Sequence, residues 1–279
     1  MKIKPFIKLI RPLNVTITFL SVWAGVFISA GKIESGNLLK ILLASIGAAL
    51  INASGNVIND VFDIATDKAN RKKNRPLVVE EISKKSAVIF YVILTLLSIP
   101  FLYYSGTAQL IIGAISIVLL FLYSLFLKRL PMLGNIIVGL ETGLVFVYAG
   151  FLTETWWNSF IPFYFAVHIN IVRELIKSWE DLPGDSQNFI YTLPYFIEET
   201  TTKIVIAVLS VLLMFVTYLP YYFSKFNEYY LIIVMLGVNI PLIYVIKKIF
   251  EERPEFPKIH KAMKAAMLFG LLAMVVGVM

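Results

Sequence analysis

Residues 38–67 read LLKILLASIGAALINASGNVINDVFDIATD, an apolar run that ends among aspartates. The part from residue 38 to residue 59 is long enough to cross a bilayer as one helix, because a spanning helix needs about 20 mostly apolar residues. Its uninterrupted apolar character argues against a strand of a membrane barrel, in which polar and apolar residues alternate. The stretch therefore predicts a transmembrane helix whose end carries carboxylates to one face of the membrane.

The whole chain has the composition of a membrane protein. Of its 279 residues, 58% are hydrophobic and 15% are charged, whereas soluble domains carry roughly 25% charged residues. It contains no cysteine, which excludes disulfides and thiolate metal sites. Apolar stretches run nearly end to end, so we expect one membrane domain over residues 1–279, an all-α polytopic bundle of nine transmembrane helices. The predicted spans are 13–31, 38–59, 86–105, 107–127, 132–152, 158–178, 203–222, 229–249 and 262–279.

The basic residues indicate how these spans are oriented. With nine helices, 22 of the 25 Lys and Arg residues fall on the side of the amino terminus. Cytoplasmic loops carry such an excess. The distribution predicts a multi-pass cell-membrane protein with its amino terminus in the cytoplasm and its carboxy terminus outside. The formal charge of +7 is then a topology signal and requires no nucleic-acid partner.

All five aspartates fall in two short clusters on the predicted cytoplasmic side: Asp60, Asp63 and Asp67 in the first, and Asp181 and Asp185 in the second. In the first cluster, a helical spacing of four aligns Asn59, Asp63 and Asp67 on one face, with Asp60 one residue round. Like charges at this spacing repel each other. A divalent cation removes that repulsion, and Mg²⁺ typically takes one or two carboxylates together with waters and substrate phosphates.

The second cluster combines acids with a lysine. Spacings of three and four place three side chains on one face at the end of the sixth span: Glu174, Lys177 and Asp181. Pro183 and Gly184 are expected to end that helix and to leave Asp185 on a loop. A lysine beside metal-binding acids suits a phosphorylated ligand, whose oxygens the two kinds of cation neutralise together. The alternative is that both clusters are solvated helix ends.

A basic stretch follows the first cluster at residues 68–75. One interpretation is an anchor on anionic lipid headgroups. The other is that Arg71 or Arg75 turns inward to a phosphate. The spacing does not choose between them.

The motifs together resemble those of the UbiA superfamily of intramembrane prenyltransferases. They are NDxxDxxxD at 59–67, NRPL at 74–77, KxxxDxxxD at 177–185 and TLP at 192–194. Weaker matches are Arg11-Pro12 before the first span, Tyr123-Ser124 with Lys128 after the fourth, and Gly134-Asn135 at the start of the fifth. The chain departs from the family pattern at Ser178, where aspartate is common, and at 78–81, where many members have a Pro-Ser-Gly stretch.

The resemblance implies a helical bundle around a central cavity, in which two Mg²⁺ ions bind the diphosphate of an isoprenyl donor near the cytoplasmic surface. The metal ligands that it implies are Asn59, Asp60, Asp63, Asp67, Asp181 and Asp185. The catalytic groups that it implies would steady the departing diphosphate, and they are Lys177, Tyr123, Arg71, Arg75 and Lys128.

Within the superfamily, the motifs and the lysine-rich loop most resemble the archaeal digeranylgeranylglyceryl phosphate synthases. These transfer a geranylgeranyl group from its diphosphate to the free hydroxyl of geranylgeranylglyceryl phosphate, in ether lipid synthesis. The resemblance thus implies a lipid-like phosphorylated acceptor, reached from the membrane. A 4-hydroxybenzoate-type polyprenyltransferase is the alternative enzyme.

An anion or lipid transporter is the non-enzymatic alternative. Transporters of that kind usually place ionisable groups near the bilayer midplane. Here the acids lie at helix ends, with the exception of Glu141 inside the fifth span, which either bonds within the bundle or orients an acceptor. The oligomeric state is open.

Overall fold

The computed structural model describes residues 3–70, 72, 74–187, 191–223 and 225–279. All regular secondary structure in these residues is helical. Nine of the described helical stretches are long and apolar enough to cross a membrane. The predictions of an all-α fold and of nine spans are therefore confirmed.

The long helices are α2 (Pro12–Ala30), α3 (Leu38–Phe62), α5 (Lys84–Ser105), α6 (Thr107–Leu125), α7 (Leu133–Gly150), α8 (Phe160–Gln187), α10 (Glu199–Val216) and α14 (Phe256–Gly277). The remaining span joins α12 (Glu228–Val234), the π-helical segment η4 (Met235–Asn239) and α13 (Ile240–Ile249). Short elements connect them: α1 (Ile3–Ile10), η1 (Ser35–Asn37), α4 (Ile64–Ala69), η2 (Leu127–Arg129), η3 (Trp156–Ser159), α9 (Leu193–Phe196) and α11 (Leu219–Tyr222).

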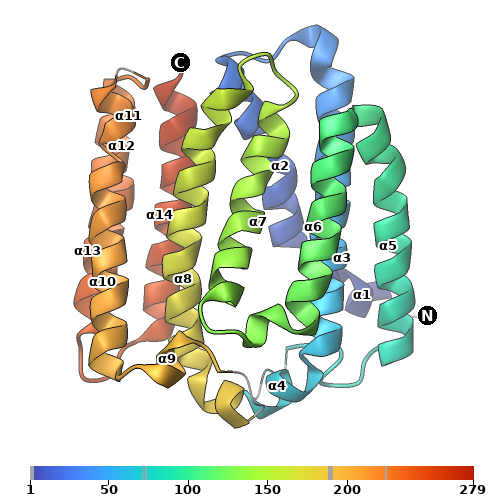
Figure 1. Ribbon diagram of the computed structural model, residues 1–279, viewed down its shortest axis with the longest axis vertical. Coiled ribbons are helices and arrows are strands. Elements are labelled where there is room, and N and C mark those ends of the chain that lie inside the picture. The colour runs from blue at the N-terminus through green and yellow to red at the C-terminus, as the bar shows by residue number, and fades with distance from the viewer. Residues whose placement is uncertain (1–2, 71, 73, 188–190, 224) are drawn as a thin grey trace.

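The long helices lie side by side along the long axis of the molecule (Figure 1). Figure 1 shows α4 and α9 together at one end, and the carboxy terminus at the other. We call the end that holds α4 and α9 the motif end, because the two aspartate clusters lie there. Since α8 continues toward this end past the start of α7, the last turns of α8 stand beside α4.

Apolar side chains hold the bundle together in three clusters. The first packs α8 against α10, α12, α13 and α14, with Val172, Leu242 and Met263 fully buried. The second holds α3 against α1 and α5, and the third holds α3 against α2 and α7. The outer faces of α5 and α6 expose aliphatic side chains such as Leu96 and Val118, as contact with lipid requires.

Small residues of α3 allow it to pack closely against its neighbouring helices. A Cβ added at Gly47 would lie 3.0 Å from Leu102 of α5, and one at Gly55 would lie 2.8 Å from Leu120 of α6. Small residues allow helix backbones to approach closely in membranes, where burial of apolar surface gives little driving force. A buried hydrogen bond adds to this packing, because the Tyr148 hydroxyl donates to the carbonyl of Ala44 at 2.8 Å.

The expected end of the sixth span at Pro183 and Gly184 is wrong. The corresponding helix, α8, continues through Pro183 to Gln187, so Asp185 lies on a helix and not on a loop. Proline removes one backbone donor, but Pro183 lies four residues before the last residue of α8, so one intrahelical bond near the end of the helix is lost. Continuing the helix for one more turn keeps Asp185 on the same face as Asp181.

The contact between α7 and α8 provides a test of this packing. A Cβ at Gly143 would lie 2.6 Å from Val167 Cγ2 and 2.9 Å from the carbonyl oxygen of Phe163. We expect Gly143→Ala to force the two helices apart and to lower the free energy of unfolding by about 1–3 kcal/mol. The measurement is the thermal unfolding midpoint of the purified protein in detergent.

The control is Gly36→Ala, because no described atom lies within 4 Å of a Cβ at Gly36. Equal midpoints for the two variants would contradict the close approach of α7 and α8.

Candidate active site

A pocket of about 80 Å³ lies at the motif end, between α4, the end of α6, the start of α7 and the last turns of α8. Four aspartates line it, two from each cluster: Asp63, Asp67, Asp181 and Asp185. Three lysines line it as well: Lys72, Lys128 and Lys177. The fold therefore brings the two aspartate clusters, more than 100 residues apart in sequence, to one place.

The first cluster is divided between two helices. Helix α3 ends at Phe62 and α4 begins at Ile64, so Asp63 stands at the break between them. Asn59 Nδ2 donates to Asp63 Oδ2 at 2.8 Å, which fixes the position of that carboxylate. The predicted alignment of Asn59, Asp63 and Asp67 on one continuous helix is wrong, yet both aspartates line the pocket, because α4 packs against α8.

The second cluster lies on one face of α8. Lys177, Asp181 and Asp185 follow one another at intervals of four residues and all line the pocket. One turn deeper, the buried carboxylate of Glu174 accepts from Arg173 at 2.8 Å and lies 3.7 Å from Lys177 Nζ. Glu174 therefore holds Lys177, whose side chain is 48% exposed, at the wall of the pocket.

Lysines connect the two clusters. Lys72 Nζ lies 3.0 Å from Asp181 Oδ2 and 3.6 Å from Asp67 Oδ1, so it bridges α4 and α8. Lys128, whose side chain is 9% exposed, donates to Asp63. These cations balance the carboxylates that the fold has gathered. Tyr123, from the last turn of α6, completes this part of the lining.

Asp60 and Arg75 lie outside the pocket lining. The Asp60 side chain is 2% exposed and accepts hydrogen bonds from Arg11 at 2.5 Å and from Arg75 at 3.0 Å. Arg75 also approaches Asp67, at 3.6 Å. Asp60 thus joins the junction of α1 and α2 to the loop after α4. Arg71, named among the catalytic groups, falls outside the described residues.

Burial raises the pKa of Asp67 above its ordinary value, and the neighbouring Asp63 and Asp60 add to this effect, while Arg75 and Lys72 oppose it. The carboxylate therefore takes up a proton more readily than an exposed aspartate as the pH falls. A bound cation would act in the opposite direction, because it favours the charged form of its ligand.

The donor set fits Mg²⁺ that is shared with a phosphorylated ligand. Within the described part of the chain, no three His, Cys, Asp or Glu side chains are placed to enclose a metal ion by themselves. Mg²⁺ needs no such cage, because it usually takes one or two carboxylates plus waters and substrate phosphates. The aspartate pairs 63/67 and 181/185 meet this requirement. Asn59 Oδ1, buried and without a hydrogen-bond partner among the described residues, is a further oxygen of the right kind.

Sequence reasoning missed several residues of the pocket: Thr66, Lys72, Asn135, Ser178 and Thr192. Lys72 belongs to the basic stretch 68–75, in which only the arginines were singled out. Asn135 appeared only in the short Gly134-Asn135 match. In both cases the partner comes from α8, and no local pattern encodes such a contact.

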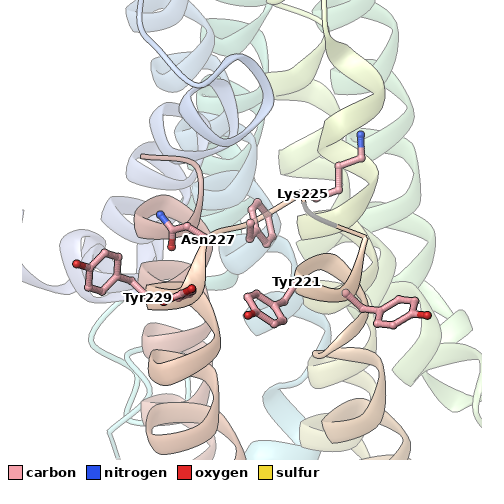
Figure 2. Close-up of a pocket in the computed structure, with 7 residues that line it drawn as sticks. Tyr221, Lys225, Asn227 and Tyr229 are labelled. Atoms are coloured by element: carbon pink, nitrogen blue, oxygen red, sulfur yellow. The ribbon is translucent and has the colours of Figure 1, made fainter.

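A second hollow, of about 770 Å³, lies at the opposite end of the molecule and is open to solvent. Figure 2 shows Tyr221 and Tyr229 on either side of it, with Lys225 extending away from them. Exposed tyrosines at a helix end are typical of the membrane–water interface. The hollow contains no residue of either aspartate cluster.

The comparisons with known proteins agree with these observations. The model of the UbiA prenyltransferase family matches residues 18–278. The digeranylgeranylglyceryl phosphate synthase of Sulfolobus acidocaldarius is 33% identical over 252 residues, which cover 88% of each chain.

Two solved structures extend the likeness. One, of digeranylgeranylglyceryl phosphate synthase in membranes, has 31% identity and a TM-score of 0.78, and the match covers 99% of this chain and 98% of that one. The other, a UbiA homologue from Archaeoglobus fulgidus bound to GPP and Mg²⁺, has 16% identity and a TM-score of 0.67, and the match covers 98% and 99% of the two chains. At this lower identity the second structure supports the fold.

The buried contact of Asp60 with two arginines can be tested by Asp60→Asn, which keeps the shape of the side chain and removes its charge. We expect the free energy of unfolding to fall by about 2 kcal/mol, because hydrogen bonds to buried charged groups contribute about that much. The measurement is the unfolding midpoint in detergent.

The control is Glu80→Gln, since Glu80 forms an exposed ion pair with Lys68 and should change stability by less than about 0.5 kcal/mol. An unchanged midpoint for Asp60→Asn, together with weaker Mg²⁺ binding, would instead favour the metal-ligand role that the resemblance implies.

Proposed function

We propose, from the premise that this chain belongs to the UbiA prenyltransferase family, that it transfers a geranylgeranyl group from its diphosphate to the free hydroxyl of geranylgeranylglyceryl phosphate, with Mg²⁺ as cofactor. That the protein is a membrane prenyltransferase follows from the family, and it replaces the transporter alternative. The observation that carries the finer proposal is the pocket itself, which is lined by four aspartates from two distant motifs, by Glu174 and by three lysines.

The carboxylates are suited to hold metal ions on a diphosphate. We assign Asp63 and Asp67, with Asn59, to one Mg²⁺ and Asp181 with Asp185 to a second. Bound Mg²⁺ supplies positive charge that neutralises the diphosphate oxygens as the carbon–oxygen bond breaks. The related structure with GPP and Mg²⁺ supports this assignment by showing that a protein of this fold binds both.

The lysines act on the phosphate oxygens directly. Lys72 and Lys128 are paired with carboxylates in the structure. When other cations satisfy those carboxylates, the two ammonium groups are left beside the bound anion. Lys177 already extends into the pocket. The Tyr123 hydroxyl is a further donor at the same wall. In this assignment Arg75 acts by holding Asp60 and Asp67, and Arg71 remains a candidate outside the described residues.

The acceptor is proposed from the relatives. The Sulfolobus acidocaldarius protein and the first solved structure share the name digeranylgeranylglyceryl phosphate synthase, at 33% and 31% identity. A phosphorylated acceptor requires additional cations near the pocket, and the motif end carries them. An aromatic acid such as 4-hydroxybenzoate is the alternative acceptor.

We further propose that the motif end faces the cytoplasm and that residues 1–279 act as one domain. In support of the orientation, 22 of the 25 Lys and Arg residues fall on the side of the amino terminus when the nine predicted spans are laid out in order. The carboxy terminus, at the opposite end in Figure 1, is then outside. The donor would enter from the cytoplasmic leaflet.

Removing a carboxylate from either cluster tests the metal assignment. We expect Asp63→Ala and Asp181→Ala each to lower the turnover number at least about 100-fold, because the departing diphosphate loses charge stabilisation. Both proteins should still unfold cooperatively in detergent. The measurement is Mg²⁺-dependent formation of prenylated product.

Glu34→Ala is the matched control, because Glu34 is an exposed acid at the opposite end, paired with Lys32 at 3.1 Å. Wild-type turnover in Asp63→Ala or in Asp181→Ala would refute the assignment of that cluster.

A direct comparison of acceptors tests the proposed substrate. Purified protein is incubated with geranylgeranyl diphosphate and Mg²⁺, in parallel with geranylgeranylglyceryl phosphate or with 4-hydroxybenzoate. We expect an ether product with the glycerol phosphate alone, identified by mass spectrometry. Product with the aromatic acid alone would overturn the proposed acceptor and leave the prenyltransferase assignment intact.

A further inference from the structure

We propose that the side-chain amide of Asn135, oriented by Ser178, donates a hydrogen bond to the donor oxygen that departs when the prenyl group is transferred. The proposal rests on the proposed function, because it assumes that the pocket holds an isoprenyl diphosphate. It adds a catalytic residue, Asn135, and a positioning residue, Ser178.

The first observation is an unused donor in the pocket wall. Asn135 is 7% exposed, belongs to the first turn of α7 and lines the pocket. Its Oδ1 accepts from Ser178 Oγ at 3.2 Å, whereas its Nδ2 is buried and has no hydrogen-bond partner within the part of the chain that the structure describes. A buried N–H group without a partner is unfavourable, and a ligand in the pocket would supply the missing acceptor.

The second observation is the depth at which this donor lies. Ser178, Asp181 and Asp185 share one face of α8, at spacings of three and four residues. With a rise of about 1.5 Å per residue, Ser178 lies roughly 10 Å farther from the motif end than Asp185. The start of α7, which carries Asn135, stands beside this deeper part of α8 (Figure 1). A diphosphate held by the aspartates has its ester oxygen on this side, since the prenyl chain must point into the bundle.

The third observation is the end of α7 itself. This helix has 18 residues, and its first turn carries the backbone N–H donors and the partial positive charge of a helix start. Gly134 lies in that turn and lines the pocket, and a Cβ there would be 3.0 Å from the backbone of Lys128. Glycine thus lets the helix start approach Lys128, and the amide of Asn135 extends the same set of donors.

A hydrogen-bond donor beside the ester oxygen of the diphosphate assists the transfer of the prenyl group. The bond between the prenyl C1 and the ester oxygen breaks, and its electron pair stays on the oxygen of the departing diphosphate. C1 then bonds to the hydroxyl oxygen of the acceptor, and the hydroxyl proton leaves with the diphosphate. Negative charge grows on the ester oxygen only as the bond breaks, so a hydrogen bond from Asn135 Nδ2 strengthens in the transition state and accelerates the step.

Four variants test the proposal: Asn135→Ala, Asn135→Leu, Ser178→Ala and Asn170→Ala. Asn135→Leu keeps about the size of the side chain, removes the N–H donor and adds no charge beside the diphosphate. Asn170→Ala is the matched control, because Asn170 is a buried asparagine of α8, 1% exposed, that donates to Ala166 within its own helix and does not line the pocket.

The measured quantity is the release of diphosphate from geranylgeranyl diphosphate with Mg²⁺ and either acceptor, because diphosphate departs whichever acceptor is prenylated. We expect the turnover number to fall about 100-fold in both Asn135 variants, about tenfold in Ser178→Ala, in which the amide is present but no longer oriented, and to stay unchanged in Asn170→Ala.

A binding measurement separates transition-state stabilisation from ordinary affinity. The probe is the thiolo analogue of geranylgeranyl diphosphate, in which sulfur replaces the ester oxygen. Its dissociation constant, with Mg²⁺ present, should change less than about threefold in both Asn135 variants. A loss of affinity as large as the loss of turnover would make Asn135 a ground-state binding residue and overturn the proposal.

The outcomes distinguish this inference from the proposed function. Wild-type diphosphate release in Asn135→Ala overturns the inference alone. If that variant does not fold, Asn135→Leu decides in the same way. If the wild-type protein releases diphosphate only with the aromatic acceptor, the proposed acceptor is overturned. The comparison of variants then still decides the role of Asn135. A wild-type protein that releases no diphosphate with either acceptor overturns the proposed function and this inference together.

Discussion

The repulsion among four aspartates in one small pocket is the constraint on which the site depends. Asp63, Asp67, Asp181 and Asp185 come from two distant parts of the chain, and their charges would separate α4 from α8 if nothing balanced them. Lys72 spans the gap between the two helices, and Lys128 covers Asp63. The balance consists of ion pairs whose side chains are between 7% and 28% exposed. A site of this kind holds its shape without ligands and can still accept metal ions and phosphates.

Asp60 shows that neighbouring acids in one motif serve different purposes. A rotation of about 100° per residue separates Asp60 from Asn59 and turns it away from the pocket. There it meets the guanidinium groups of Arg11 and Arg75, which match a carboxylate better than lysine does. The result is a buried contact that fixes the loop after α4, and thereby Asp67, in place. The motif thus combines the proposed metal ligands with a residue, Asp60, that supports them.

The sequence predicts the fold well because the signals for it are local. A run of about 20 apolar residues suffices to identify a spanning helix. The nine spans are found within a few residues of their expected bounds, apart from α8, which is longer at its end, and α14, which begins at Phe256 and not at residue 262. The sequence also singles out the candidate acidic site, because the chain has no aspartates outside the two clusters. The errors concern contacts between helices. Neither the continuation of α8 past Pro183 nor the partners of Lys72 and Asn135 follow from the residues beside them, because each depends on how α4, α7 and α8 pack.

That packing follows from the way helices associate in a membrane, through small residues at their contacts. Gly139 and Gly143 bring the backbone of α7 against α8, where a Cβ at Gly139 would lie 3.0 Å from the carbonyl oxygen of Val167. Only at such an approach can Asn135, one turn nearer the motif end than Gly139, reach Ser178 with a short polar side chain. Larger residues at these glycines would widen the gap and separate the pair. The small residues that hold the bundle together in lipid are therefore also what brings the polar groups of the pocket within hydrogen-bonding distance of each other.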